Sequence, residues 1–272
     1  MEYATDSFEV ILVDDGGSCD LESVLKIHSR RLAARLIRQV NGGPASARNL
    51  GASFAAGEFL AFTDDDCEPD PAWLQTLQTQ LAAAPEHMIG GRIVNGAPDN
   101  FYATASQLLH DALYSHYNRN HNTARFFTSN NFAISARLFY EVGGFEAGFP
   151  MAAGEDREFC DRWRRSGFGL TYAPEAVVRH NHRMSLATYW SQNFRYGRGA
   201  CQYRRIARKA RHRVAFEGLT FYWDILRQPL QELSGWAAAR QSGAMALAQF
   251  AVSGGYFWEA LLGGGASKTK NP

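Results

Sequence analysis

Two apolar runs, each followed by aspartates, constrain most strongly what this chain can fold into. Phe8–Val13 reads FEVILV and leads into Asp14-Asp15-Gly16-Gly17, while Phe59–Thr63 reads FLAFT and leads into Asp64-Asp65-Asp66. Short continuous apolar runs bounded by turn residues are typical of buried parallel strands. Because α/β sheets bind ligands at the carboxyl ends of their strands, both aspartate clusters are candidate site residues.

Helical patterns alternate with these strands. Residues 21–27 and 45–56 have helical spacing, and a third pattern begins at Pro71 with apolar positions at Trp73, Leu77 and Leu81. Strands alternating with helices predict an α/β fold with a mostly parallel, doubly wound nucleotide-binding sheet and flanking helices. In that arrangement we expect both aspartate clusters on the same edge of one sheet.

The strand signals stop near Ser185, and the rest of the chain has helical patterns. We therefore predict an α/β domain over residues 1–184 and a helical C-terminal region over residues 185–272. The most apolar stretch, Ala244–Leu262, contains Gly254, Gly255 and Glu259. This composition favours an interfacial or buried helix over one that spans a membrane.

Composition narrows the environment and the partners. The chain has 272 residues, 46% of them apolar, which supports a sizeable core, and its net charge of +1 gives no overall argument for a nucleic-acid partner. The four cysteines are scattered without a CxxC pair, which predicts neither a disulfide scaffold nor a structural zinc site and fits a reducing cytoplasm. The N-terminal residues have no secretory-signal pattern.

Asp64 and Asp66 are the strongest candidates for a metal site. Carboxylates at i and i+2 of an extended loop can share one divalent cation and its diphosphate ligand, and oxygen ligands suit Mg²⁺ or Mn²⁺. A solvated acidic turn is the alternative, which the position after a buried strand disfavours. Asp14 and Asp15 are candidates to accept hydrogen bonds from a base or ribose, with an Asx turn as the alternative.

Three later features add candidate residues. Arg48 lies one turn into the helix that follows Asn41-Gly42-Gly43-Pro44 and can pair with a carboxylate or a phosphate. Glu155 and Asp156 open an amphipathic helix, where acids either complement the helix dipole or serve as a general base. His180 and His182 follow a strand-like stretch and are either metal ligands or surface histidines.

In this order, these segments resemble the inverting family-2 glycosyltransferases of the GT-A fold, over nearly the whole chain. The matching segments are VDDGG at 13–17, NGGPASARN at 41–49, FTDDDCEPDPAWL at 62–74, TSNNFAISARLFYEVGGF at 128–145, GEDREFCDRWRRSG at 154–167 and QNFRYGRG at 192–199. The last is a variant of the family's QxxRW element, with Tyr196 in place of tryptophan. Each segment alone is modestly specific, and six in order are highly specific.

The resemblance implies a catalytic domain that transfers a sugar from a nucleotide-sugar donor to an acceptor hydroxyl with inversion. It implies donor or acceptor contacts by Asp14, Asp15, Arg48, Asp64, Asp65, Asn130, Asn131, Gln192 and Arg195. The implied metal ligands are Asp64, Asp66 and His180. The implied catalytic base is Asp156, with Glu155 beside it.

The implied acceptor is a glycan or a lipid-linked molecule, in the synthesis of cell-surface polysaccharide or glycolipid. Members of the family usually begin with another strand and helix, and here only Met1–Ser7 precede the first strand. We therefore expect that strand and helix to be lacking, through a late start, a fragment or divergence. Two other functions stay open: a nucleotidyltransferase, disfavoured by the lack of a glycine-rich phosphate loop near the N-terminus, and a non-catalytic nucleotide-sugar or glycan-binding protein.

A basic segment distinguishes the C-terminal region. Its members are Arg195, Arg198, Arg204, Arg205, Arg208, Lys209, Arg211 and Arg213, and the aromatic residues Phe216, Phe221, Tyr222 and Trp223 follow. This pattern predicts attachment to the anionic inner face of the plasma membrane. The alternative is that the aromatic residues pack on the catalytic domain while the basic residues face solvent or carboxylates.

Overall fold

The computed structural model describes residues 3–28, 32–149 and 153–263. These divide into two compact units, the first within residues 1–94 and 120–179 and the second within residues 95–119 and 180–272. The strands are β1 (Glu9–Asp14), β2 (Ala33–Arg38), β3 (Phe59–Phe62), β4 (Cys67–Pro69), β5 (Met88–Asn95), β6 (Phe132–Ser135) and β7 (Leu170–His180). The helices are α1 (Leu21–His28), α2 (Pro44–Phe54), α3 (Trp73–Ala83), α4 (Phe101–Tyr117), α5 (Ala136–Val142), α6 (Glu155–Arg165), α7 (Leu186–Lys209), α8 (Leu219–Glu232) and α9 (Gly235–Leu262). A short 3₁₀ helix covers His121–Thr123.

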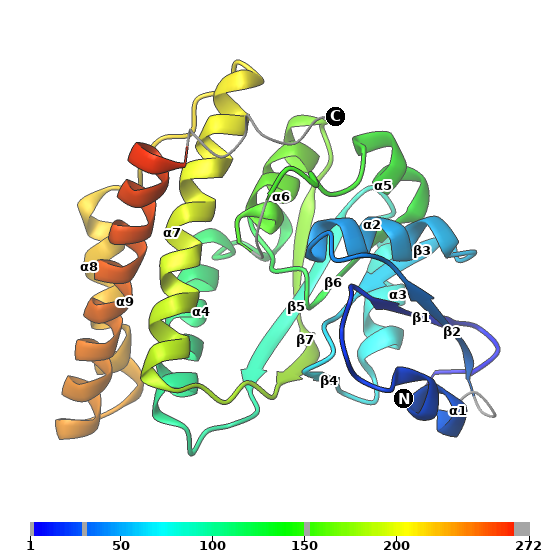
Figure 1. The fold of residues 1–272 in the computed structure, drawn as a ribbon, viewed down its shortest axis with the longest axis horizontal. Helices are drawn as coiled ribbons and strands as arrows, with labels where there is room; N and C mark the ends of the chain where they lie inside the picture. Colours follow the sequence, from blue (N-terminus) through cyan, green and yellow to red (C-terminus); the bar gives the residue numbers. More distant parts are fainter. Residues whose placement is uncertain (1–2, 29–31, 150–152, 264–272) are drawn as a thin grey trace. The chain divides into compact units, whose positions relative to one another are not determined.

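The first unit contains two sheets. Strands β1 and β2 form a parallel pair that runs in register from Glu9 opposite Ala33 to Asp14 opposite Arg38. Helix α2 lies beside this pair and contacts β1 (Figure 1). The second sheet has five strands in the order β3-β6-β5-β7-β4. The chain is therefore α/β, as predicted.

The strand pairing differs from the predicted arrangement in two ways. The five-stranded sheet is mixed, because β6 lies antiparallel to both of its neighbours, β3 and β5. The expectation that the two aspartate clusters share an edge of one sheet is wrong. Strand β1 hydrogen-bonds to β2, whereas β3 hydrogen-bonds to β6, so Asp14 and Asp64 end strands of separate sheets.

Two apolar clusters hold the five-stranded sheet. Helix α3 packs Trp73, Leu77 and Leu81 against a group that includes Ile89 and Val178 of the sheet. A second cluster is aromatic and joins β3 and β6 to α5, α6 and the turn between them; its rings are those of Phe62, Phe132, Phe139, Phe145 and Phe159. Buried aromatic residues contribute large apolar areas, so this cluster fixes where α6 begins relative to the end of β3.

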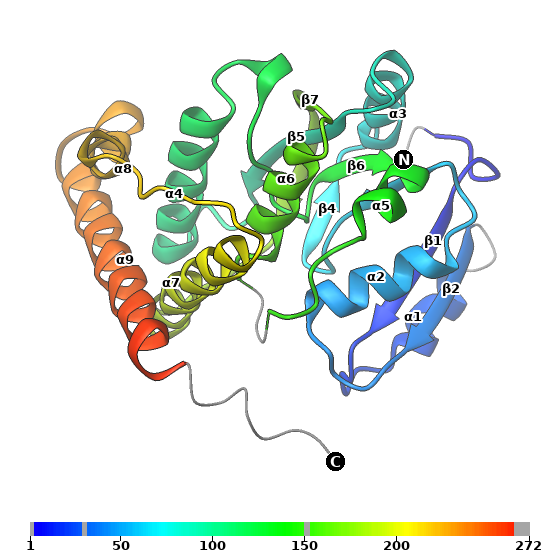
Figure 2. The ribbon, with the colours of Figure 1, turned by 90° about the horizontal axis from the view of Figure 1, so that it is seen from above.

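The second unit combines α4 with α7, α8 and α9. Helices α7 and α9 run side by side in the same direction (Figures 1 and 2). Gly197 and Gly255 allow this close approach, because a Cβ atom at either would overlap a backbone carbonyl oxygen of the opposite helix, that of Val252 or Phe194. The buried carboxylate of Glu259, near the carboxyl end of α9, pairs with Arg198 and Arg205 of α7. Within the described ranges, no helix has the length and apolar composition needed to cross a membrane.

Candidate active site

The loop after β1 is organised by Asp15. Its carboxylate accepts hydrogen bonds from the Gln39 side chain at 2.6 Å and from the backbone N–H groups of Gly42 and Gly43 at 2.7 and 2.9 Å. Partial burial acts to raise the pKa of Asp15, but these hydrogen bonds hold it below its usual value. Asp15 therefore stays ionised and fixes the turn that starts α2.

Asp14 is the last residue of β1 and is buried, with 7% of its surface exposed. One carboxylate oxygen accepts the Gly17 N–H at 2.7 Å, and the other lies 3.4 Å from Nε of Arg38. The bond to Gly17 spans three residues rather than the two of an Asx turn, and it gives Asp14 a local role in shaping the loop. A contact of Asp14 or Asp15 with a nucleoside stays a prediction.

Arg48 brings together residues that are distant in the sequence. Its Nη2 donates to Asp64 Oδ1 at 2.9 Å, and its Nη1 lies 3.3 Å from Glu155 Oε1 and 4.0 Å from Asp156 Oδ1. Asp64 follows β3, and the two acids open α6, where Gly154 adopts a left-handed conformation (φ 93°) that favours glycine. Three predicted site segments thus meet at one guanidinium.

Burial makes this group of charges electrostatically strong. The side chains of Arg48 and Glu155 are 15% and 6% exposed. Burial, and secondly repulsion by Asp156, raise the pKa of Glu155 to about 7, although Arg48 opposes the shift. Burial also raises the pKa of Asp156, against the effects of Arg48 and of hydrogen bonds from Ser129. Burial acts to lower the pKa of Arg48, but Asp156 and Asp64 raise it, so Arg48 stays charged.

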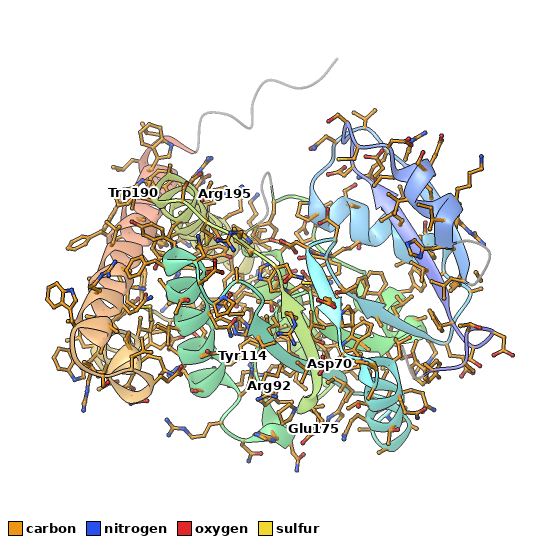
Figure 3. All side chains as sticks on the ribbon, turned by 90° about the horizontal axis from the view of Figure 1, so that it is seen from below. Asp70, Arg92, Tyr114, Glu175, Trp190 and Arg195 are labelled. Carbon is orange, nitrogen blue, oxygen red and sulfur yellow. The ribbon has the colours of Figure 1, made fainter. Side chains whose placement is uncertain are left out.

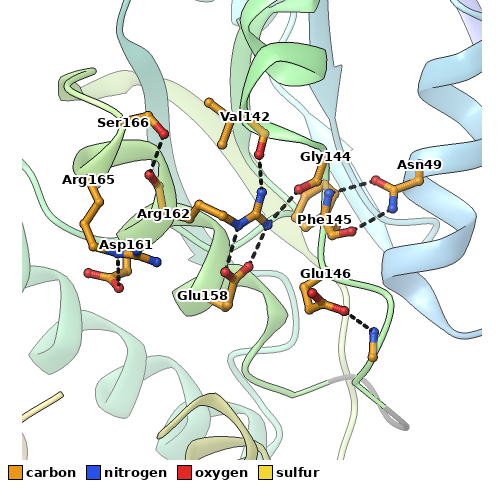
Figure 4. Close-up of polar contacts among 11 residues, drawn as sticks. Asn49, Val142, Gly144, Phe145, Glu146, Glu158, Asp161, Arg162, Arg165 and Ser166 are labelled. Carbon is orange, nitrogen blue, oxygen red and sulfur yellow. Dashed lines mark hydrogen bonds and ion pairs between the residues drawn. The ribbon is translucent and has the colours of Figure 1, made fainter. Parts of the chain in front are cut away.

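The turn from Val142 to Phe145 links the two helices that carry these charges. From α2, the Asn49 amide donates to the Phe145 carbonyl and accepts its N–H, both at 2.8 Å. From α6, Arg162 donates to the carbonyl oxygens of Val142 and Gly144 and forms an ion pair with Glu158 at 2.7 Å (Figure 4). These contacts hold Arg48, the neighbour of Asn49, against the first turn of α6.

Asp66 belongs to a different group from Asp64. One carboxylate oxygen of Asp66 and one ring nitrogen each of His180 and His182 lie within 4.8 Å of one another. His180 ends β7, and the chain reaches His182 two residues later. One carboxylate and two imidazoles are a donor set that suits a divalent first-row metal ion, so these residues fit such an ion. Asp65, between the two aspartates, is exposed.

Asn130 and Asn131 follow the TS dipeptide before β6 and are both buried. The Asn131 amide accepts from Trp73 Nε1 at 2.8 Å and donates to the carbonyl oxygens of Arg92 and Ala176, so it braces α3, β5 and β7. Asn130 accepts from the Thr128 hydroxyl at 2.8 Å. Contacts of either residue with a sugar or an acceptor stay predictions.

Gln192 and Arg195 lie on α7, in the second unit. The Gln192 amide donates to the Tyr196 hydroxyl at 2.7 Å, and Arg195 is exposed (Figure 3). The predicted place of Gln192 and Arg195 at the border of the active site stays a prediction.

In the first unit, Figure 3 also shows Arg92 and Glu175, exposed residues of the neighbouring strands β5 and β7.

His182, which the sequence singled out together with His180 as a candidate metal ligand, lies in the metal-type group. The structure also adds two residues that the sequence did not single out. Ser129 hydrogen-bonds to Asp156, and Asn49 holds the turn at Phe145. For Ser129 and Asn49, the only signal in the sequence was their position inside segments that match the family, because their contacts join distant parts of the chain.

Comparison with known proteins identifies the family. The sequence profile of glycosyl transferase family 2 matches residues 2–147, and the chain belongs to this family. The pre-mycofactocin glycosyltransferase of Mycobacterium tuberculosis is 30% identical over 195 residues, which are 70% of this chain and 41% of that protein. The hyaluronan synthase of Pasteurella multocida is 26% identical over 195 residues, 59% of this chain and 20% of that protein. The chain thus spans less than half the length of these relatives.

The fold is that of the GT-A glycosyltransferases. The mannosyltransferase PcManGT of Pyrobaculum calidifontis, solved with GDP-Man and Mn²⁺, superimposes with a TM-score of 0.63 at 17% sequence identity, covering 94% of this chain and 80% of that one. GalNAc-T7, solved with UDP, GalNAc and Mn²⁺, gives a TM-score of 0.53 at 18% identity, over 94% of this chain and 50% of that one. The predicted family and fold class are therefore confirmed.

Proposed function

We propose that this protein transfers a sugar from a nucleotide-sugar donor to an acceptor hydroxyl, with inversion at the anomeric carbon. The observation that carries the proposal is the meeting of Asp64, Glu155 and Asp156 at Arg48. The group contains a buried cation and carboxylates from the two segments that the family resemblance assigns to donor binding and to proton transfer. Family membership supports the same activity.

A divalent cation is part of the proposal, and Asp66, His180 and His182 would hold it. When bound, it would neutralise charge on the donor diphosphate and on the departing nucleoside diphosphate. The two imidazoles favour Mn²⁺ over Mg²⁺, because Mg²⁺ prefers oxygen ligands. Two structural neighbours that were solved with Mn²⁺ support this choice.

We assign the base to Asp156. The family resemblance assigns this role to Asp156, whose side chain is 19% exposed against 6% for Glu155, although its Oδ1 atom is itself buried. No donor among the described residues bonds to its Oδ1, and hydrogen bonds from Ser129 orient the group. A raised pKa makes a carboxylate a stronger proton acceptor near neutral pH. Asp156 takes the proton of the acceptor hydroxyl. The hydroxyl oxygen of the acceptor attacks the anomeric carbon of the donor sugar, and the bond from that carbon to the diphosphate breaks.

Glu155 then serves as a neighbour that sets the charge of the pair. Its pKa of about 7 means that Glu155 is partly protonated near pH 7, which lowers the negative charge beside Asp156, and Arg48 limits how far both pKa values rise. Arg48 also contacts Asp64, so it connects the proton acceptor to the aspartate that the resemblance assigns to the donor. For the acceptor we propose a growing glycan or a lipid-linked sugar, which the similarity to a relative named for making hyaluronan supports.

The test compares Asp156→Asn with Glu155→Gln in a transfer assay that screens nucleotide sugars and acceptors in the presence of Mn²⁺. Asp156→Asn should keep donor binding by calorimetry and lose roughly 10²- to 10⁴-fold in transfer rate, since it removes the proton acceptor. Asp161→Asn is the matched control on the same helix, where the carboxylate pairs with Arg165 instead.

Other outcomes point elsewhere. Loss of transfer in Glu155→Gln with an active Asp156→Asn would move the base to Glu155. Release of diphosphate from a nucleoside triphosphate and a sugar phosphate would identify a nucleotidyltransferase. Donor binding with no transfer to any acceptor would identify a non-catalytic nucleotide-sugar-binding protein.

A further inference from the structure

Positive charge is concentrated in the C-terminal part of the chain. Residues 185–272 contain twelve Lys and Arg against four Asp and Glu, whereas residues 1–184 contain sixteen against twenty-three. The near-neutral total of the whole chain hides this difference. The positive side chains of such a local surplus must either pair with an anionic partner or be hydrated by solvent.

The basic side chains of α7 divide into two groups. Arg198 and Arg205 are neutralised by Glu259, and Arg204 lies 3.9 Å from the centre of the Phe216 ring. Arg195, in the amino-terminal half of α7, is exposed, and so are four basic side chains at the carboxyl end of α7 and just beyond it: Arg208, Lys209, Arg211 and Arg213. Among the residues that the structure describes, none of these four has an acidic partner within ion-pair distance.

An apolar surface lies at the same end of the second unit. Helix α9 exposes Phe250, Phe257 and Leu261 at 72%, 63% and 80%, with spacings of seven and four residues that place them on one face. From Ala244 to Leu262 the only charged side chain is the buried Glu259. Helix α8, which contacts α9, and the segment before it also expose apolar side chains: Phe216, Leu219, Tyr222, Trp223 and Leu230.

The two features are continuous. Arg205 contacts Glu259, and Phe216 packs 5.7 Å from Tyr256, so the end of α7 lies beside the last turns of α9. Figure 1 shows the carboxyl ends of both helices at one end of this unit. Aromatic and aliphatic side chains next to exposed Arg and Lys side chains are typical of surfaces that insert into the interfacial region of a bilayer.

We propose that the exposed face of α8 and α9, together with Arg208, Lys209, Arg211 and Arg213, binds the surface of a membrane containing anionic lipid. The apolar side chains enter the interfacial region while the basic side chains contact the headgroups. Charge decides the occupant. A second copy of this chain would bring the same positive surplus to the contact, and like charges repel, whereas an anionic leaflet is complementary.

The experiment is co-sedimentation of the full chain with vesicles of phosphatidylcholine, with and without phosphatidylglycerol, at low and high ionic strength. Binding should require the anionic lipid and weaken as salt rises. Removing two charges in Arg208→Gln/Lys209→Gln should lower the partition coefficient roughly 25-fold, at about fivefold per basic residue. The matched control is Arg92→Gln/Arg137→Gln, which removes two exposed charges of the first unit and should bind as the unmodified chain does.

A second test variant and its control measure the contribution of the apolar side chains to vesicle binding. Phe250→Ser/Phe257→Ser should lower partitioning by at least about tenfold, since each ring loses its burial in the interface. Val24→Ser/Ile27→Ser, which changes two exposed residues of α1, should have no effect, and circular dichroism would check that each variant is folded.

Three outcomes would overturn the proposal. The first is equal binding to vesicles with and without anionic lipid. The second is an equal loss of vesicle binding in the test and control variants. The third is that the chain self-associates without binding vesicles, and that Phe250→Ser/Phe257→Ser abolishes the self-association. The readout is binding alone, so failure here would not bear on sugar transfer.

Discussion

Arg48→Met removes the positive charge that contacts Asp64, Glu155 and Asp156 while keeping most of the apolar volume of the side chain. In the unmodified protein the guanidinium and the Glu155 carboxylate are both largely buried. Breaking a buried ion pair by removing one partner costs about 3–5 kcal/mol, because the remaining charge is left uncompensated. The cost falls if that charge can be neutralised by a proton.

Protonation makes the cost depend on pH. The pKa of Glu155 is already raised from 4.5 to about 7 with Arg48 present, and that of Asp156 is raised as well. Without Arg48 both rise further above their unfolded values, so the folded variant binds protons more tightly than the unfolded chain. Its stability is then greatest below about pH 4.5 and is lost as pH rises through and beyond 7. We expect a loss of about 3 kcal/mol at pH 8 and about 1 kcal/mol at pH 5.

Urea unfolding of Arg48→Met at pH 5 and pH 8 measures both values. The control is Arg137→Met, which breaks an exposed i,i+4 pair with Glu141 and should change stability by less than about 0.5 kcal/mol at either pH. Equal losses at the two pH values, or a loss no larger than the control's, would refute the reasoning that Arg48 balances buried carboxylates.

Three further predictions follow from single contacts. The unmodified protein should lose at most about 3 kcal/mol of stability through Glu155 as pH rises from 4.5 to 7, and Glu155→Gln should remove this loss. Over that range, the unfolding free energy of the variant should therefore rise relative to that of the unmodified protein. Asp66→Ala and His182→Ala should each weaken Mn²⁺ binding at least about tenfold by calorimetry, and unchanged affinity in both would exclude this ligand group. Gly255→Ala should destabilise by about 1–3 kcal/mol in thermal unfolding because its Cβ meets the Phe194 carbonyl, whereas Gly243→Ala, which meets nothing, should stabilise slightly.

Local sequence was sufficient for the elements that begin and end with strong signals. Continuous apolar runs predicted the strands at Phe8–Val13 and Phe59–Thr63, and the structure has β1 and β3 there. The Gly-Gly-Pro turn predicted the start of α2, because proline suits the first helical position. The ordered family segments were enough to predict the GT-A fold, since they record which residues a common site needs.

Sheet membership was not available from the same signals. A buried strand has the same apolar composition whether its neighbours run parallel or antiparallel, so nothing local showed that β6 pairs antiparallel with β3 and β5. For the same reason, nothing local separated β1 from the sheet that contains β3. These pairings depend on contacts between residues far apart in the chain.

The sequence by itself determined which carboxylates, arginines and histidines are present and that the DDD cluster follows a buried strand. Only the tertiary structure decided how that cluster is divided. Asp64 pairs with Arg48, which is sixteen residues earlier, while Asp66 lies with His180 and His182, more than a hundred residues later. The chain turns between these two aspartates, where the Cys67 N–H donates to the Asp64 carbonyl at 3.1 Å, so their carboxylates separate. What each one meets depends on where α2 and β7 are packed rather than on the residues beside it.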